Sequence, residues 1–181
     1  MLLVSQNLSK YMPITDDSVV RINLAWVDSI EKLALMVENI SQDIFLDLPI
    51  GRTKPPNNNY SLEDVKKIIV NHSNIKYLAV SNIESSKDLE QYLKLDRLIV
   101  IPKIESLNGV MNIGDICSSL GDIKIIMLDH DDLFSDLIRN GINASNFFKY
   151  IKQLDNYCKD SGVRLLKTRG VIFSDTDKYY F

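Results

Sequence analysis

Short runs of apolar residues alternate along the chain with longer segments whose apolar residues recur at helical spacing. The runs are rich in Val, Ile and Leu and cover residues 19–26, 44–50, 76–83, 97–104, 123–130 and 163–171. Continuous apolar runs of this length are typical of strands buried on both faces of a parallel sheet. Between them, residues such as Ile30, Leu33 and Val37 follow the helical period. The alternation predicts a parallel α/β fold.

The positions of polar residues separate an open sheet from a barrel. Polar side chains come late in the apolar runs or directly after them, at Asn23, Asp47, Ser81, Glu105, Asp132 and Thr168. Barrel enzymes place their chemistry at these strand ends, so we expect a (β/α) barrel of the TIM type. A complete eight-unit barrel takes about 250 residues, whereas this chain of 181 shows six clear strands and a seventh in MLLVS. The expected barrel is therefore incomplete, with six to seven strands in a single domain, 1–181.

Composition narrows the class of protein. The chain has 21 Lys and Arg against 24 Asp and Glu, a net charge of -3, which excludes a generic nucleic-acid binder. No apolar run approaches the roughly 18 residues that cross a bilayer, and the first residues lack the pattern of a signal peptide. We therefore expect a cytoplasmic protein with no membrane partner.

The few histidines and cysteines constrain any metal site. The chain has two histidines, His72 and His130, and two cysteines, Cys117 and Cys158, which fall in helical patterns and are expected to be reduced core residues. A zinc site built from His and Cys is therefore not expected, and a bound metal would be a hard ion such as Mg²⁺ or Mn²⁺ held by carboxylate oxygens.

One constellation of residues can carry chemistry. Lys103 and Glu105 are two apart on an expected strand, so their side chains leave the same face, the interior of a barrel. Asp132 follows the next strand, and because adjacent strands lie about 4.8 Å apart, Glu105 and Asp132 can share one divalent cation. Such a cation retains open positions for a substrate carboxylate and its neighbouring oxo group. Spacing alone leaves a second interpretation open, in which these acids are helix caps and loop ion pairs.

The acidic turn around Asp132 is more ambiguous. Asp129, Asp131 and Asp136 are expected to favour the dipole of a helix that begins near Leu133, rather than to bind a ligand. His130 is expected to be a solvated loop residue.

Several segments carry a family resemblance. The sequence VIPKIESLNGVMNIGDI, residues 100–116, resembles the pyruvate kinase strand and helix in which Lys-Ile-Glu precedes Gly-Val and Asn-Ile. In the same order, VVRINLAW, IFLDLPIGRT, LAVSNIESSKDL and GVRLLKTRG resemble further pyruvate kinase strands. The chain thus resembles a pyruvate kinase barrel domain of the phosphoenolpyruvate/pyruvate barrel superfamily, without the lid and C-terminal domains. The turn LDHDDLFSDL instead resembles a motif of the citrate lyase and 2-oxoacid aldolase branch.

The resemblance implies roles for individual residues. Glu105 and Asp132 would bind Mg²⁺ or Mn²⁺, and Lys103 would lie beside the enolpyruvate oxygen. Arg21 would face the transferred phosphate, and Thr168 would lie near the methylene carbon, so Lys103, Arg21 and Thr168 are the expected catalytic residues.

Further residues would complete the substrate site. Arg21, Asn23 and Ser81 are expected to bind substrate. Asn23 and Asp47 would match part of a monovalent-cation site, which implies K⁺.

The expected function is a metal-dependent enzyme that acts on phosphoenolpyruvate, pyruvate or a related 2-oxoacid through an enolpyruvate intermediate. Phosphoryl transfer and carbon–carbon lysis both stay open. The alternative is an eroded barrel that serves as a binding or regulatory module. A barrel wall short of strands leaves unpaired edges, so we also expect a homodimer that buries Tyr179, Tyr180 and Phe181 or the strand around Leu3.

Overall fold

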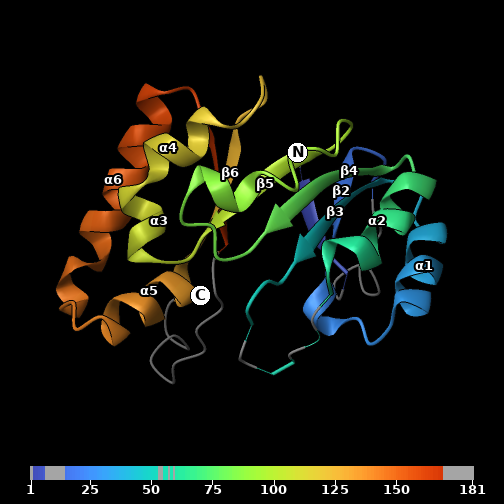
Figure 1. Ribbon diagram of the computed structural model, residues 1–181, viewed down its shortest axis with the longest axis horizontal. Coiled ribbons are helices and arrows are strands. Elements are labelled where there is room, and N and C mark those ends of the chain that lie inside the picture. Colours follow the sequence, from blue (N-terminus) through green and yellow to red (C-terminus); the bar gives the residue numbers. More distant parts are fainter. Residues whose placement is uncertain (1, 7–14, 53–54, 57, 59, 169–181) are drawn as a thin grey trace.

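A single curled sheet of parallel strands forms the centre of the molecule (Figure 1). This computed structural model describes residues 2–6, 15–52, 55–56, 58 and 60–168. The sheet has seven strands, and each strand pairs in parallel with the next one along the sequence. The strands are β1 (Leu2–Ser5), β2 (Ser18–Asn23), β3 (Asp43–Leu48), β4 (Ile75–Val80), β5 (Ile99–Ile104), β6 (Ile125–Asp129) and β7 (Arg164–Thr168). The expected parallel α/β fold is confirmed, in the form of a half-barrel sheet.

Helices cover the outer side of this sheet. They are α1 (Ile30–Glu38), α2 (Leu62–Asn71), α3 (Leu107–Met111), α4 (Ile113–Ser118), α5 (His130–Arg139) and α6 (Phe147–Asp160), with short 3₁₀ helices η1 (Leu24–Trp26), η2 (Ser86–Leu89) and η3 (Ala144–Asn146). Helices α1 and α2 lie beside the early strands, and α3, α4 and α6 lie on the opposite flank (Figure 1). Within the described residues, none of the helices combines the length and the apolar character needed to span a membrane.

Several apolar runs extend beyond the strands that they form. The run from residue 19 to 26 is a strand only to Asn23, because the Asn23 side chain accepts a hydrogen bond from the backbone N–H of Ala25 (3.0 Å) and starts η1.

Helix α2 begins where the sequence indicates. The Ser61 hydroxyl accepts from the backbone N–H of Asp64 (3.2 Å), and the Asp64 carboxylate accepts from the backbone N–H of Ser61 (2.7 Å). Local hydrogen bonds thus set these boundaries.

Two separate apolar layers pack against the two faces of the sheet. The larger layer lies between the sheet and the helices and includes the buried thiols Cys117 and Cys158, which are free as expected. The smaller layer lies on the concave face and consists of Val19, Phe45, Ala79, Ile101, Ile125 and Met127. The concave face is therefore a packed core at its amino-terminal end rather than an open channel.

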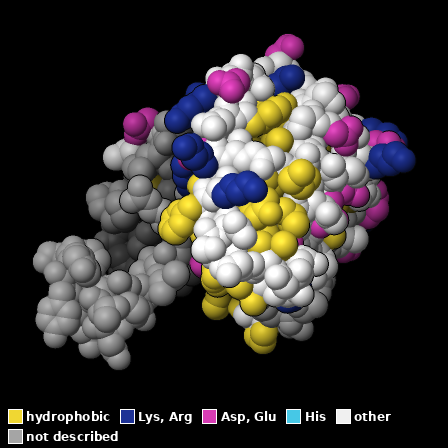
Figure 2. All heavy atoms as spheres, turned by 90° about the vertical axis from the view of Figure 1, so that its left-hand side faces the viewer, with side chains coloured by type: hydrophobic (Ala, Val, Ile, Leu, Met, Phe, Trp, Pro, Cys, Tyr) yellow, Lys and Arg dark blue, Asp and Glu magenta, His cyan; other side chains and the backbone are white. Residues whose placement is uncertain are grey.

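Apolar side chains are also exposed on the flank that carries α3 to α6, where Figure 2 shows them gathered among polar neighbours. The large exposed apolar residues of these helices are Met111, Phe134, Ile138 and Phe148. The ring of Phe134 also packs edge-on against Phe147, at 5.2 Å between centroids.

Helix α3 approaches the sheet closely at Gly109. A Cβ atom at this position would lie 2.8 Å from the carbonyl oxygen of Ile83, in the segment that follows β4. Only a glycine allows this approach without displacing the backbone. Gly109 thereby holds the start of α3 against a segment that borders the candidate site.

Candidate functional site

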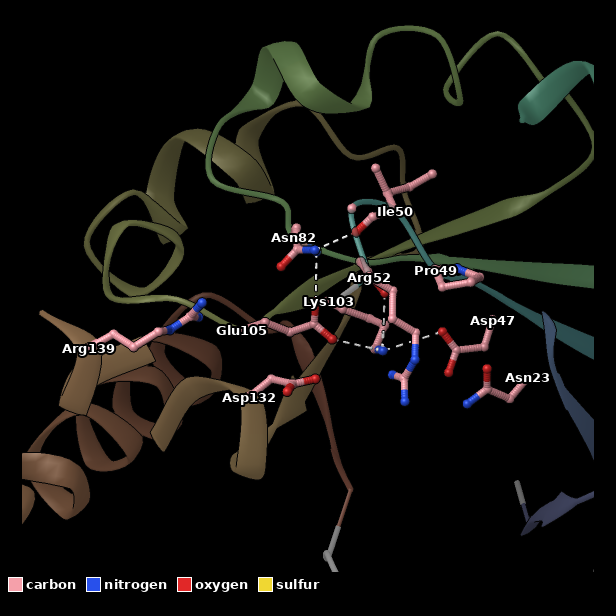
Figure 3. A pocket seen from close by; sticks show the side chains of 12 residues that line it. Asn23, Asp47, Pro49, Ile50, Arg52, Asn82, Lys103, Glu105, Asp132 and Arg139 are labelled. Carbon is pink, nitrogen blue, oxygen red and sulfur yellow. Dashed lines mark hydrogen bonds and ion pairs between the residues drawn. The ribbon is translucent and has the colours of Figure 1, made fainter. Parts of the chain in front are cut away.

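The candidate site lies where the strands of the concave face end. Side chains two positions apart on a strand share a face, so Asp47 follows Phe45, Lys103 follows Ile101 and Asp129 follows Met127 on the concave side. Asp47 and Lys103 line a cavity of about 150 Å³ (Figure 3). Its polar lining includes Asp47, Arg52, Asn82, Lys103, Glu105 and Asp132.

Lys103 stands at the centre of the charged groups. Its Nζ lies 2.8 Å from Glu105 Oε1, 3.4 Å from Asp47 Oδ1 and 3.8 Å from Asp129 Oδ2, and it donates to the Ser81 hydroxyl at 3.3 Å. Burial by itself would lower the pKa of Lys103, but Asp47 and Glu105 raise that pKa above its usual value. Lys103 therefore stays protonated and acts as a fixed positive charge, not as a base. The expected common face of Lys103 and Glu105 is confirmed.

Asp47 is paired with two cations of the chain. Arg21 donates to Asp47 Oδ2 from Nε at 3.1 Å and also from Nη2, while Lys103 approaches the other oxygen. Burial alone would raise the pKa of Asp47, but Lys103 and Arg21 hold that pKa below its usual value. Asn23, which lines the same cavity, accepts from Ala25 through its side-chain oxygen. Binding of K⁺ by Asn23 and Asp47 stays a prediction, and the Asp47 carboxylate already has Arg21 and Lys103 as counter-ions.

Three carboxylates converge at the other side of Lys103. One oxygen each from Glu105, Asp129 and Asp132 lies within 4.8 Å of the others, and Glu105 is buried while the two aspartates are half-buried. Oxygen ligands at such spacing suit a hard divalent cation. The expected pair of Glu105 and Asp132 is thus brought together and gains a third member.

The third member, Asp129, was expected only to favour a helix start, and that expectation was incomplete. Asp129 does cap α5, because its carboxylate accepts from the backbone N–H of Asp132 at 3.4 Å. The same side chain faces Lys103 and belongs to the carboxylate triad. The missed signal is the alternation along β6, in which Asp129 continues the face of Ile125 and Met127.

Asn82 is a further residue that sequence reasoning missed. Its backbone N–H donates to Glu105 Oε2 at 2.8 Å, and its side-chain amide donates to the carbonyl of Ile50 (Figure 3). Burial raises the pKa of Glu105, and this effect outweighs the opposing influence of Lys103 and of the Asn82 N–H. A cation beside Glu105 would favour its charged form.

Two arginines also line the cavity without a sequence signal, since Arg52 follows a strand within a loop and Arg139 ends α5. Arg52 Nε donates to the Pro56 carbonyl at 2.7 Å, which holds the side chain in place. Arg139 lies 3.6 Å from Asp136, which in turn accepts from the backbone N–H of Leu107 at 2.8 Å. The cavity therefore carries positive groups around its carboxylates.

The remaining expected site residues are placed as follows. Ser81 is buried against Lys103, and the backbone of Thr168 pairs with Asp129 at the β6–β7 edge of the site. The side chain of Thr168 and the tail residues Tyr179, Tyr180 and Phe181 lie outside the described residues.

Comparisons with known proteins give a match among solved structures. No family model and no curated protein matches the sequence. Among solved structures, the chain is similar to the crystal structure of RipC from Yersinia pestis, with a TM-score of 0.63 and 17% identity over 98% of this chain and 78% of that chain. At this identity the similarity shows the fold alone.

The comparison corrects the assignment made from sequence resemblance. The structure of RipC matches almost the whole chain, and the sheet is a seven-stranded half-barrel rather than a barrel of the phosphoenolpyruvate/pyruvate superfamily. The identification as a pyruvate kinase-like member of that superfamily, with its citrate lyase branch, is therefore wrong. Short motifs such as Lys-Ile-Glu reflect a strand that ends in a buried ion pair, and that arrangement does not require membership of the family.

Proposed function

We propose that this chain is a divalent-metal-dependent enzyme that acts on a 2-oxoacid, such as pyruvate or phosphoenolpyruvate, through an enolate intermediate. The observation that carries the proposal is the contact of the protonated Lys103 amine with Glu105, a carboxylate that also belongs to the triad with Asp129 and Asp132. A fixed positive charge beside a cation site is the arrangement that stabilises negative charge developing on an oxygen.

Glu105, Asp129 and Asp132 would hold the metal. The donor set contains only carboxylate oxygens, which fits Mg²⁺ or Mn²⁺. When bound, such an ion acts as a Lewis acid on a carbonyl oxygen and leaves positions open for substrate.

Lys103 and Arg21 would have different electrostatic roles in the site. Arg21 pairs with Asp47 and so reduces the pull of that carboxylate on Lys103. The Lys103 amine can then face the enolate oxygen of the substrate from the edge of the triad. Phosphoryl transfer and carbon–carbon lysis both pass through such an enolate. The guidance of proton transfer by Thr168 and substrate contacts from Asn23 and Ser81 stay part of this proposal.

Titration of the full chain with Mn²⁺ tests the metal site. Glu105→Gln removes one charged ligand oxygen and should weaken Mn²⁺ binding by at least about 100-fold. The matched control is Glu38→Gln, since Glu38 is an exposed carboxylate at the end of α1, and it should bind as the wild type does. Equal binding by Glu105→Gln and the wild type would refute the site.

Proton exchange tests the chemistry without presupposing the overall reaction. In deuterium oxide, an enzyme that stabilises the enolate should catalyse loss of the methyl protons of pyruvate, followed by proton NMR, and should require Mn²⁺. Lys103→Met should slow this exchange while Mn²⁺ is still bound. Binding of Mn²⁺ and pyruvate with no exchange above the metal alone would instead support the binding-module alternative.

We also propose that the half-barrel is an incomplete barrel of the TIM type and that two copies associate. Support comes from the sequential strand order, the helices on the outer side and the polar strand ends. Strands β1 and β7 lie at the two ends of the strand order, and uncovered edge strands favour pairing with another chain. Sedimentation velocity should give a dimer, and a monomer at micromolar concentration would contradict this.

A further inference from the structure

Asn82 joins two parts of the pocket that come from different strands. Its side-chain amide donates to the carbonyl of Ile50, in the loop of residues 49–52 that follows β3. Its backbone N–H donates to Glu105 Oε2 at 2.8 Å, just after β5. Figure 3 shows both bonds leaving this one residue. One residue therefore contacts both the loop and a member of the carboxylate triad.

The backbone of Asn82 has an unusual conformation that makes these contacts possible. Among the described residues, it is the non-glycine position with a positive φ, 55°. Asparagine is one of the few residues that adopt this left-handed conformation at small cost. The conformation turns the N–H of Asn82 toward Glu105 while the side chain points to the loop. The sequence choice at this position thus fits a requirement of the site.

The neighbours of Asn82 fix it in place. The N–H of Ser81 donates to the Leu48 carbonyl at 3.2 Å, and the N–H of Ile83 donates to the Lys103 carbonyl at 3.4 Å. Residues 81–83 are therefore tied to the end of β3 on one side and to β5 on the other. Displacement of the loop would be transmitted through this short segment.

The loop lies close to the Asn82 side chain. Its backbone accepts a hydrogen bond from the Asn82 amide at Ile50, and a Cβ atom added at Gly51 would lie 3.6 Å from Asn82 Nδ2. Ile50, Gly51 and Arg52 line the same cavity as Glu105. A ligand in the cavity can therefore touch the loop and the triad at once.

We propose that Asn82 is a positioning residue that couples the loop of residues 49–52 to the orientation of Glu105, so that an oxoacid that contacts the loop in the cavity and a divalent cation held by the triad bind cooperatively. This inference rests on the proposed function for the identity of the two ligands. Cooperativity of this kind is reciprocal, because each ligand raises the affinity for the other by the same factor.

Titration with Mn²⁺ in the absence and presence of saturating pyruvate tests the coupling. In the wild type, pyruvate should raise the affinity for Mn²⁺ by about fivefold or more. Asn82→Gly keeps the backbone N–H and accepts the positive φ, but loses the bond to Ile50. It should bind Mn²⁺ alone within about twofold of the wild type, whereas the enhancement by pyruvate should fall below about twofold.

The matched control is Asn74→Gly. Asn74 also donates its side-chain amide to a backbone carbonyl, that of Ile40 at 2.8 Å, but it does not line the cavity. This variant should retain the full enhancement. Full enhancement in Asn82→Gly, or equal loss in both variants, would overturn the proposal.

Hydrogen–deuterium exchange provides a readout that needs no ligand. Without metal or pyruvate, both Asn82→Gly and Glu105→Gln should increase deuterium uptake in peptides that contain residues 49–52, whereas Asn74→Gly should not. Unchanged uptake in both site variants would overturn the coupling. Absence of Mn²⁺ binding by the wild type would refute the proposed function alone, since the exchange data would still decide the role of Asn82.

Discussion

The two ends of the concave face are built from the same strands but hold opposite kinds of side chain. Toward the amino-terminal end, Phe45, Ile101 and Met127 form a closed apolar layer. The ring of Phe45 stacks on the ring of Tyr77, with 6.1 Å between the two ring centroids. Two residues further along the same strands, Asp47 and Lys103 are still almost fully buried but carry charges. One step of the strand period thus separates a core that stabilises the fold from a site that can bind ions.

The two layers differ in how burial of their side chains affects the stability of the fold. Burial of apolar groups is favourable by itself, whereas buried charges need partners to offset their desolvation. The charged layer meets this requirement through Lys103, which contacts Asp47, Glu105 and Asp129. We expect substitutions in the apolar layer to alter stability alone, and substitutions in the charged layer to alter stability and ligand binding together.

The largest expected effect is in the apolar layer. Phe45→Ala removes a fully buried ring and should lower the free energy of unfolding by about 4 kcal/mol, measured by urea denaturation. Leu35→Ala is the control, because Leu35 is 60% exposed. Mn²⁺ affinity of the folded Phe45→Ala chain should be unchanged, and a change of more than tenfold would break the separation between the layers.

The next effect is in the charged layer. Asp47→Asn removes the carboxylate that faces Arg21 and Lys103, and it should lower the free energy of unfolding by about 3 kcal/mol near neutral pH, because Arg21 loses its pair with Asp47 and Lys103 loses one of its carboxylate partners. Urea denaturation at several pH values measures it. A loss below about 0.5 kcal/mol, the range of ordinary surface substitutions, would show that the pair contributes little.

The pH dependence of this difference has a definite sign. The pKa of Asp47 in the folded chain is held below the usual 3.8, so its contribution is fully present above pH 3.8 and is lost as pH falls through the lowered value. The gap between wild type and Asp47→Asn should therefore close on acidification below pH 3.8. A gap that widens there would contradict the assigned pairing.

A smaller effect should come from the packing that borders the site. Gly109→Ala places a Cβ atom against the Ile83 carbonyl and should lower the free energy of unfolding by about 2 kcal/mol through overpacking. Because Ile83 is next to Asn82, Mn²⁺ affinity should fall as well. Gly121→Ala is the matched control, since a Cβ atom there meets nothing within 4 Å. Equal behaviour of the two variants would show that α3 can shift without affecting the site.

The smallest expected change in stability is at the metal ligand itself. Glu105→Gln should alter the free energy of unfolding by no more than about 1 kcal/mol at neutral pH, because the raised pKa of Glu105 means that the folded chain disfavours its charge. The Glu105 contribution is present below the usual value of 4.5 and is lost as pH rises through the raised folded pKa. Relative to wild type, the variant should gain stability across that rise, and a progressive loss there would contradict the assigned direction.

The fold was predictable because its strands are buried on both faces and its helices carry regular apolar stripes. The period of two also placed Lys103 and Glu105 on one face correctly. The place of Asp129 in the carboxylate triad was not predicted, because an aspartate that caps a helix and an aspartate that faces the site have the same sequence pattern. Asn82 was missed because its role depends on a positive φ and on the carbonyl of Ile50 in the loop after β3, and neither is visible in residue types. The short motifs misled the family assignment because Lys-Ile-Glu forms a local ion pair at a strand end, and this pair does not by itself define a family.

The alternation along β5 also has a consequence for how the chain selects its strand register. A slip of one residue would turn Lys103 and Glu105 under the helices and bring Pro102 and Ile104 into the cavity, because every side chain would change face. Ile104 belongs to the layer that packs against the helices, so the slipped strand would leave two charges there without Asp47 or Asp129 as partners. Unpaired buried charges are strongly disfavoured. The charged layer therefore also favours the native register of β5 over a register that is shifted by one residue.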